Sequence, residues 1–233
     1  MLCKKRWATT PCLQTKWAPV TSATRIPLIA NGTIDIECGS TVNNAERQEQ
    51  VGFSVTTFVV STKFIAKKSS KLAPLEDLRG KTVVCTSGTN TIARVNELNT
   101  KHKLGMTVNA GADHAESLLQ VASDRAAAFF EDDILLTGLA ANSRNPGEWM
   151  LGTEAYSIDP HALLLPRSDA AYKQLVDNAL IRVYKSGDVM KIYDKWFQKP
   201  IPPKNVTLNF LVSPALRKAI ANPTDSPDPA AYQ

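Results

Sequence analysis

Short apolar runs and helix-forming segments follow one another through most of this chain. The run Phe58–Ala66 is rich in β-branched and aromatic residues and predicts a long strand. Between residues 80 and 142 strand-like and helix-like segments alternate regularly, which is typical of a mostly parallel α/β sheet. The pattern therefore predicts an α/β fold whose most regular part lies in the middle of the chain.

The boundaries of the elements follow from caps and breakers. Thr21 and Ser22 are good N-caps for a helix that Asn31 and Gly32 end. The predicted strands are 17–20, 34–38, 58–66, 81–86, 107–110, 126–130 and 162–166. The predicted helices are 23–30, 45–51, 74–80, 91–104, 114–123, 134–142, 169–186, 188–197 and 213–221. Because the strands 58–66 and 162–166 flank the regular block, we expect them to be two crossings between two lobes.

The composition is typical of a globular protein. The chain has 233 residues, 43% of them hydrophobic, and a net charge of +5. Its lysines and arginines are scattered, which favours a solvated basic surface over a nucleic-acid site. No window is apolar enough to span a membrane. Residues 1–7 carry charge without a following apolar core, so no signal peptide is visible and these residues alone suggest a cytoplasmic protein.

Motifs of catalysis and metal binding are absent from the sequence. The three histidines do not have metal-ligand spacing, and neither a nucleophile elbow nor a phosphate-binding loop occurs. Cys38 and Cys85 follow apolar runs and are expected to be small hydrophobes at strand ends, whereas a pairing of Cys3 with Cys12 is left open. We therefore expect no catalytic residue, no metal and no cofactor.

Polar side chains gather where the predicted strands end. Open α/β sheets bind ligands at this edge, because loops converge there and helix N-termini present unpaired N–H groups. The residues at such places are Ser40, Arg47, Thr86, Thr89, His114 and Asp132. This pattern implies a small polar ligand.

Three of these residues have an ordinary structural alternative. Arg47 could be a helix-surface arginine paired with Glu46 or Glu49. His114 could be a cap or a surface residue at the start of its helix, and Asp132 could be a plain helix cap. Composition and periodicity leave these alternatives open.

Five segments stand together in an order and spacing that is specific to one family. They are VTSATRIPLIANGTIDIECGSTVNNAERQEQVGFS (20–54), KTVVCTSGT (81–89), AGADHAES (110–117), AAAFFEDDILL (126–136) and IYDKWFQKPIPPKNVTLNF (192–210). Over about residues 17–233 the chain resembles the periplasmic glutamate/aspartate-binding proteins of ABC transporters, in the polar amino-acid branch of the type II periplasmic binding proteins. The resemblance implies two open α/β sheets joined by hinge strands, with residues 1–62 plus 162–233 in the first lobe and 63–161 in the second.

The resemblance also implies how the backbone groups of an amino acid are held. In such proteins an arginine after the first polar loop grips the α-carboxylate, and Arg47 matches it. A guanidinium forms two parallel charge-assisted bonds to a carboxylate, which lysine cannot do. Ser40 matches a contact to the amino group or carboxylate. Asp132 matches the partner of the ammonium, with Asp133 as the second choice.

The same resemblance assigns the side-chain end of the ligand. Ser22, Arg25 and His114 match positions that hold the second carboxylate of glutamate or aspartate, and the bound anion would favour a protonated His114. Thr86 and Thr89 match the loop that closes on the ligand from the second lobe.

Three departures from the family pattern qualify this reading. Residues 1–16 match poorly, so we expect an altered N-terminus and an incomplete first lobe. Val42 replaces a threonine that would donate a hydrogen bond to the α-carboxylate, a loss of roughly 1.5–3 kcal/mol. His161 stands where tyrosine is common, with an expected structural rather than ligand-binding consequence.

The function implied is the binding component of an ABC importer. It would be a monomer in the periplasm that captures glutamate or aspartate by clamshell closure and delivers it to a membrane permease, without cofactor, nucleic acid or membrane insertion. One alternative is a dehydratase-like enzyme on the same fold, acting on prephenate-like acids with Glu131 or His114 as general acid. A second alternative is a truncated remnant that binds nothing.

Overall fold

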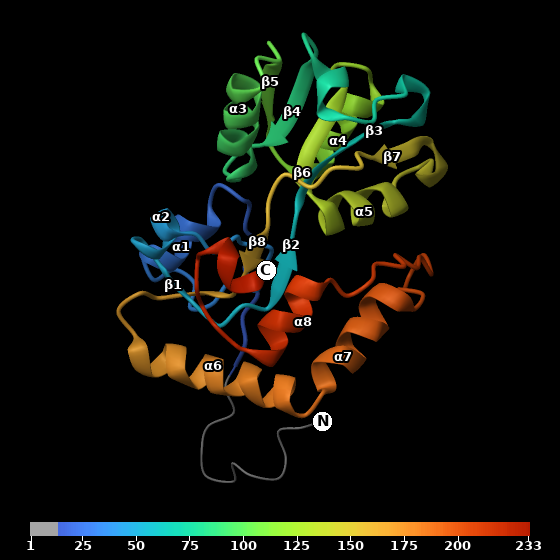
Figure 1. The fold of residues 1–233 in the computed structure, drawn as a ribbon. Helices are drawn as coiled ribbons and strands as arrows, with labels where there is room; N and C mark the ends of the chain where they lie inside the picture. The colour runs from blue at the N-terminus through green and yellow to red at the C-terminus, as the bar shows by residue number, and fades with distance from the viewer. Residues whose placement is uncertain (1–13) are drawn as a thin grey trace.

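The computed structural model describes residues 14–233, and the predictions for residues 1–13, the Cys3–Cys12 pairing among them, lie outside this range. Figure 1 shows two lobes, one above the other, joined by extended segments. The described residues form one five-stranded sheet and two two-stranded sheets.

The upper lobe is built on the five-stranded sheet, whose strand order is β5-β4-β6-β3-β7. Its strands are β3 (Thr62–Lys67), β4 (Thr82–Thr86), β5 (Thr107–Gly111), β6 (Ala128–Asp132) and β7 (Trp149–Leu151). β4 pairs in parallel with β5 and β6, while β3 runs antiparallel to β6 and β7. The helices of this lobe are α3 (Thr91–Lys101), α4 (His114–Ala122) and α5 (Asp133–Asn142), with short turns η1 (Lys68–Ser70), η2 (Leu75–Leu78) and η3 (Pro146–Glu148).

Apolar side chains from both faces of this sheet are buried, as expected for a sheet covered by helices on two sides. Phe64 and Phe130 belong to a core with Val95 of α3. Ile65 and Phe129, which alternate with them along the strands, belong to the second core. The sheet is therefore a firmly packed layer, and the loops after β4 and β6 extend from the ends of its strands.

The lower lobe has little sheet among the described residues. Its strands are β1 (Gly52–Phe53) with β9 (Leu164–Leu165), and β2 (Phe58–Val60) with β8 (Asp159–His161), both pairs antiparallel. Its helices are α1 (Arg25–Ala30), α2 (Ala45–Gln48), α6 (Ala170–Lys185), α7 (Asp188–Tyr193) and α8 (Pro214–Ala221), with η4 (Asp194–Gln198) and η5 (Pro229–Tyr232). Helices and loops thus supply most of its structure.

Two extended segments join the lobes (Figure 1). β2 and β3 are consecutive, and Ser61 between them belongs to neither strand. The chain returns through residues 152–158 into β8, which pairs with β2. Asp132, at the end of β6, lies next to these segments because Thr62 is its partner in the ladder. The first residues of the connection and the end of β6 are therefore neighbours.

Most predicted elements are present, and the differences concern the strands. The predicted strands 17–20 and 34–38 do not form, apart from one bridge between Glu37 and Leu164. The predicted strand 58–66 divides at Ser61, because its two halves belong to different sheets. β1, β7 and β8 were not predicted. β8 contains Asp-Pro-His, which has low strand propensity and pairs only because β2 lies beside it. The predicted helix 188–197 is α7 continued by the π-helical η4.

Candidate ligand-binding site

Arg25 is a buried cation at the start of α1. Its exposed fraction is 5%, and its Nε has no hydrogen-bond partner among the described residues. Burial lowers the pKa of this guanidinium, while Glu37, Glu131 and Asp132 act in the opposite direction. A buried donor without a partner is costly, so the space beside this Nε is suited to a hydrogen-bond acceptor.

Arg47 is a second buried guanidinium and does not lie on the helix surface. The side chain of Asn44 caps α2 by accepting from the backbone N–H of Arg47. The guanidinium donates to the carbonyl oxygens of Val42 at 2.9 Å and Gly88 at 3.3 Å. Burial, followed by the nearby Arg25, lowers its pKa to about 10, so the group remains charged at neutral pH. Among the described residues neither Glu46 nor Glu49 forms an ion pair with it.

His114 and Thr86 meet at the ends of α4 and β4. Nδ1 of His114 lies 2.9 Å from the hydroxyl of Thr86, which also contacts the hydroxyl of Ser117 at 3.0 Å. The helix cap is Asp113, so His114 is not the capping residue. Burial lowers the pKa of His114, Asp132 raises it and Arg25 lowers it. Without ligand the imidazole is therefore held neutral, and a bound anion would have to raise its pKa for the protonated form to appear.

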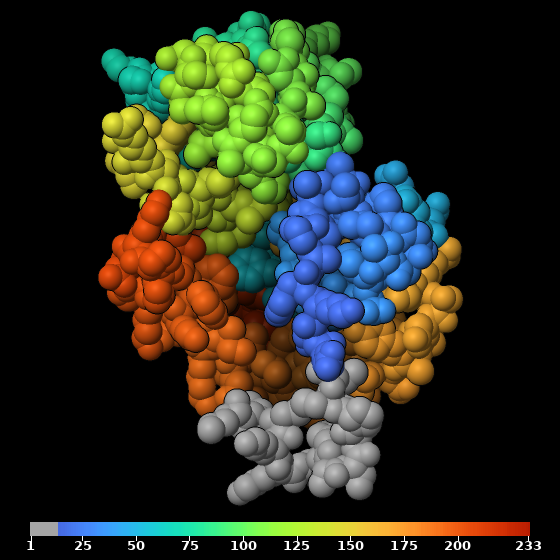
Figure 2. Space-filling view, turned by 180° about the vertical axis from the view of Figure 1, so that it is seen from behind, coloured from blue at the N-terminus to red at the C-terminus, as the bar shows by residue number. Residues whose placement is uncertain are grey.

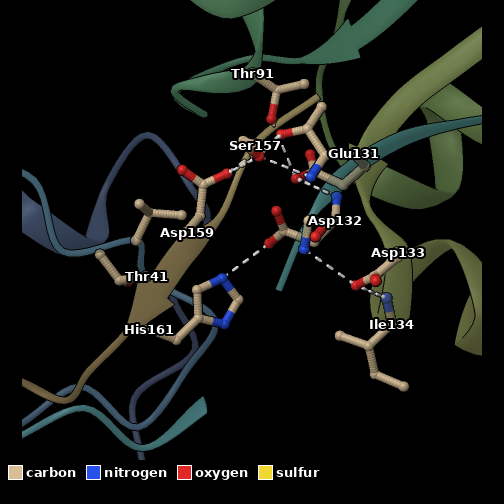
Figure 3. A network of polar contacts seen from close by, with 12 residues as sticks. Thr41, Thr91, Glu131, Asp132, Asp133, Ile134, Ser157, Asp159 and His161 are labelled. Atoms are coloured by element: carbon tan, nitrogen blue, oxygen red, sulfur yellow. Dashed lines mark hydrogen bonds and ion pairs between the residues drawn. The ribbon is translucent and has the colours of Figure 1, made fainter. Parts of the chain in front are cut away.

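Asp132 occupies the N-cap position of α5 without acting as a cap. Its side chain makes no capping bond, whereas Oδ1 of Asp133 accepts from the backbone N–H of Ile134. Asp132 Oδ2 instead lies 2.9 Å from Nε2 of His161, and both side chains are about 5% exposed. Figure 3 shows this pair, with Glu131 directed toward Thr91 on the other side of the strand end. His161 thus contacts a predicted ligand-binding residue.

The remaining predicted site residues make fewer contacts with these charged groups. Thr89 lines a cavity of about 670 Å³ together with Arg47, Gly88 and Arg94. Its hydroxyl donates to the carbonyl oxygen of Thr86, which fixes the loop after β4.

Ser22 and Ser40 are both half-buried. Neither has a side-chain hydrogen bond to another described site residue, and neither lines the cavity beside Arg47. Their placement near the ligand stays a prediction.

The two lobes touch at Gly88. A Cβ atom placed on Gly88 would lie 2.6 Å from the backbone of Ala23, and Gly88 has a φ of +78°. Figure 2 shows the blue N-terminal part of the described chain against the green surface of the other lobe. Together with the bond from Arg47 to Gly88, this proximity shows that the two lobes are in direct contact beside the cavity.

Gly88→Ala is expected to lower ligand affinity by about tenfold or more, because the methyl group would separate the lobes and an L-residue at this φ costs roughly 1–2 kcal/mol. Gly105→Ala is the matched control, since Gly105 has a φ of +63° with nothing within 4 Å of its Cβ. The thermal unfolding temperature should fall by a few degrees in both variants, whereas calorimetric titration should show weaker ligand binding only for Gly88→Ala. Equal affinities in the two variants would contradict a role for this contact.

Sequence reasoning missed several charged groups at this site. Arg94 lies 3.2 Å from Asp159 and lines the cavity beside Arg47. Glu131, considered only as an acid for catalysis, is 3% exposed and lies 3.5 Å from His114. The sequence feature that could have revealed Glu131 is a carboxylate at the end of an otherwise apolar strand, where burial removes its solvation by water.

Within 14–233 no group of three or more His, Cys, Asp or Glu side chains is arranged to hold a metal ion. In the same part of the chain no helix combines the length and apolarity that crossing a membrane requires. Cys38 is an exposed free thiol and Cys85 a buried one, whose pKa burial raises strongly.

Comparison with known proteins gives consistent similarities. The family described as bacterial extracellular solute-binding proteins, family 3, matches residues 4–199. The L-glutamate/L-aspartate-binding protein of Pseudomonas aeruginosa is 47% identical over 92% of this chain and 71% of its own length. The glutamate/aspartate import solute-binding protein of Escherichia coli is 41% identical over the same shares. Among solved structures, an ancestral arginine-binding protein bound to arginine has a TM-score of 0.71 and 24% identity, covering 78% of this chain and 80% of that one.

Proposed function

The chain belongs to family 3 of the bacterial extracellular solute-binding proteins, and it has the two-lobed fold of type II periplasmic binding proteins. We propose that it captures glutamate or aspartate for an ABC importer. The lobes proposed are residues 1–62 plus 162–233 and residues 63–161. In this proposal the amino acid docks on the first lobe and the second lobe closes over it. Binding then shifts the equilibrium toward the closed form, which a membrane permease recognises.

The observation that carries the proposal is the pair of buried guanidinium groups at 25 and 47. Both are charged, and neither has a carboxylate ion-pair partner within 14–233. The charge of Arg25 lowers the pKa of both Arg47 and His114, so the two guanidinium groups repel each other. Two cations that repel each other in a buried site favour a ligand with two anionic groups.

The ammonium of the ligand is assigned to Asp132. Its Oδ2 is held by His161, while Oδ1 has no hydrogen bond to another described side chain. A carboxylate that is held on one side and open on the other is well placed for an α-amino group. Ser22, Ser40, Thr86 and Thr89 complete the proposed contacts.

Four further features belong to the proposal. The protein acts in the periplasm as a monomer, its partner is the permease, and no cofactor takes part. The close relatives are named as binding proteins, which supports binding over catalysis.

Calorimetric titration of the purified chain with glutamate, aspartate, glutamine and arginine tests the proposal. The two dicarboxylates should bind, and glutamine should bind at least tenfold more weakly, because it leaves a buried cation unpaired. Tight binding of glutamine or arginine, with no binding of either dicarboxylate, would contradict it.

The enzyme alternative has one supporting feature, which is a buried carboxyl group, Glu131, whose pKa is raised to about 8. A protonated carboxyl group of this kind can also serve binding. Incubation with a prephenate-like cyclic acid separates the two, and we expect no product to form.

A further inference from the structure

Glu131 is the one carboxylate of the site that neither the fold nor the contacts described above explain. It is the fourth residue of β6, a strand buried along its whole length, and its side chain is 3% exposed. A carboxylate kept at such a place has to be explained by its partners.

The two oxygens of Glu131 have different surroundings. Oε1 lies 3.4 Å from the hydroxyl of Thr91 and 3.2 Å from the backbone N–H of Asp132, and both groups donate to it. Oε2 is buried and has no hydrogen bond to any described residue. His114 is nearest on that side, with Nδ1 at 3.5 Å, but its short contact is to Thr86. Oε2 therefore has an unused position for a hydrogen bond on the side of His114.

The charges around Glu131 come from several neighbouring elements. The groups that face it are Asp132 on its own strand, Arg25 of α1, His114 of α4, Cys85 of β4 and, at longer range, Arg47 of α2. Burial, followed by the charge of Asp132, raises the pKa of Glu131 to about 8, against smaller opposing effects of hydrogen bonds and of Arg25. The carboxyl group is consequently protonated at neutral pH, and since Oε1 accepts two hydrogen bonds, the proton belongs on Oε2.

We propose that Glu131 is a specificity-determining residue whose Oε2–H donates a hydrogen bond to the side-chain carboxylate of the bound dicarboxylic amino acid. The inference rests on the proposed function. Arg25 supplies the positive charge at this end of the ligand, while Glu131 and His114 supply hydrogen bonds. An ionised Glu131 would instead repel the ligand, so the site accepts a second carboxylate only while this proton is present.

The proton makes ligand affinity depend on pH in a defined direction. A bound anion favours the protonated form of Glu131, so affinity is highest below its pKa and falls as pH rises through about 8. The pKa is also raised relative to the unfolded chain, where it is 4.5. The folded state therefore binds more protons than the unfolded state between these values, and stability falls with rising pH over that range. Glu131→Gln should remove both effects.

Calorimetric titration with L-glutamate at pH 6, 7 and 8.5 tests the inference. The proteins compared are the wild type, Glu131→Gln and Glu131→Met, and the control is Glu76→Gln, because Glu76 is exposed. The wild type and the control should lose affinity severalfold between pH 7 and 8.5. Glu131→Gln, whose amide donates at every pH, should change by less than twofold, and Glu131→Met should bind about tenfold more weakly at pH 7. Thermal unfolding at pH 8.5 should show Glu131→Gln to be more stable than the wild type.

Two results would overturn the inference while leaving the proposed function intact. One is an identical pH profile for the wild type and Glu131→Gln, and the other is wild-type affinity in Glu131→Met at pH 7. A wild type that binds neither glutamate nor aspartate at any of these pH values would instead refute the proposed function and this inference with it.

Discussion

Arg47→Met is expected to lower the affinity for L-glutamate by a factor of roughly 100 to 4000, which is the largest effect of any single change at this site. Breaking a desolvated ion pair from one side costs about 3–5 kcal/mol, because the α-carboxylate would remain buried without its cation. Arg47→Lys should lose about tenfold, since lysine keeps the charge but not the two parallel bonds. Calorimetry at neutral pH measures both.

Arg144→Met and Arg144→Lys are the matched controls, because Arg144 is exposed in the loop after α5. Their affinities should equal that of the wild type. An Arg47→Met protein that is folded and binds glutamate as tightly as the Arg144→Met control would exclude Arg47 from the ligand contacts.

Arg25→Met is expected to change affinity and stability in opposite directions. Affinity for glutamate should fall by roughly 100-fold, while affinity for glutamine should change little, because the lost charge faced only the side-chain carboxylate. Without ligand, the variant should unfold at a higher temperature than the wild type, since a buried cation that repels Arg47 is replaced by an apolar side chain of similar length. Titration and thermal unfolding of the same preparation measure both changes.

A fall in affinity together with a rise in unfolding temperature distinguishes a group that binds the ligand from one that stabilises the fold. A guanidinium retained for stability would lower the unfolding temperature when removed. A fall in unfolding temperature together with equal losses for glutamate and glutamine would show that Arg25 supports the fold and does not select the ligand.

The fold was largely predictable where local pattern and tertiary pairing agree. The alternation through 80–142 predicted β4, β5 and β6 and the helices between them to within a few residues. The errors lie in the lower lobe, where strands depend on neighbours distant in sequence. β8 forms from Asp-Pro-His because β2 pairs with it, and the predicted strand 34–38 does not form because only Leu164 bridges to it. Propensity carries no information about such partners.

The motif resemblance selected Arg25 and Arg47 as candidate site residues, and both are buried, while their contact with a ligand stays a prediction. The pairing of the carboxylates at the site was not predicted. The contact between Asp132 and His161 joins residues 29 positions apart in two different sheets, and no periodicity connects them. The protonation of Glu131 depends on burial by several elements at once, so sequence inspection could not reveal it.

A crystal structure of the chain with L-glutamate tests the central claim most directly, namely that the two buried arginines hold the two carboxylates of one ligand. We predict the α-carboxylate at hydrogen-bond distance, about 3 Å, from Arg47 and the side-chain carboxylate at a similar distance from Arg25. A glutamate bound elsewhere, or one whose two carboxylates leave either guanidinium without an anionic partner, would contradict the account.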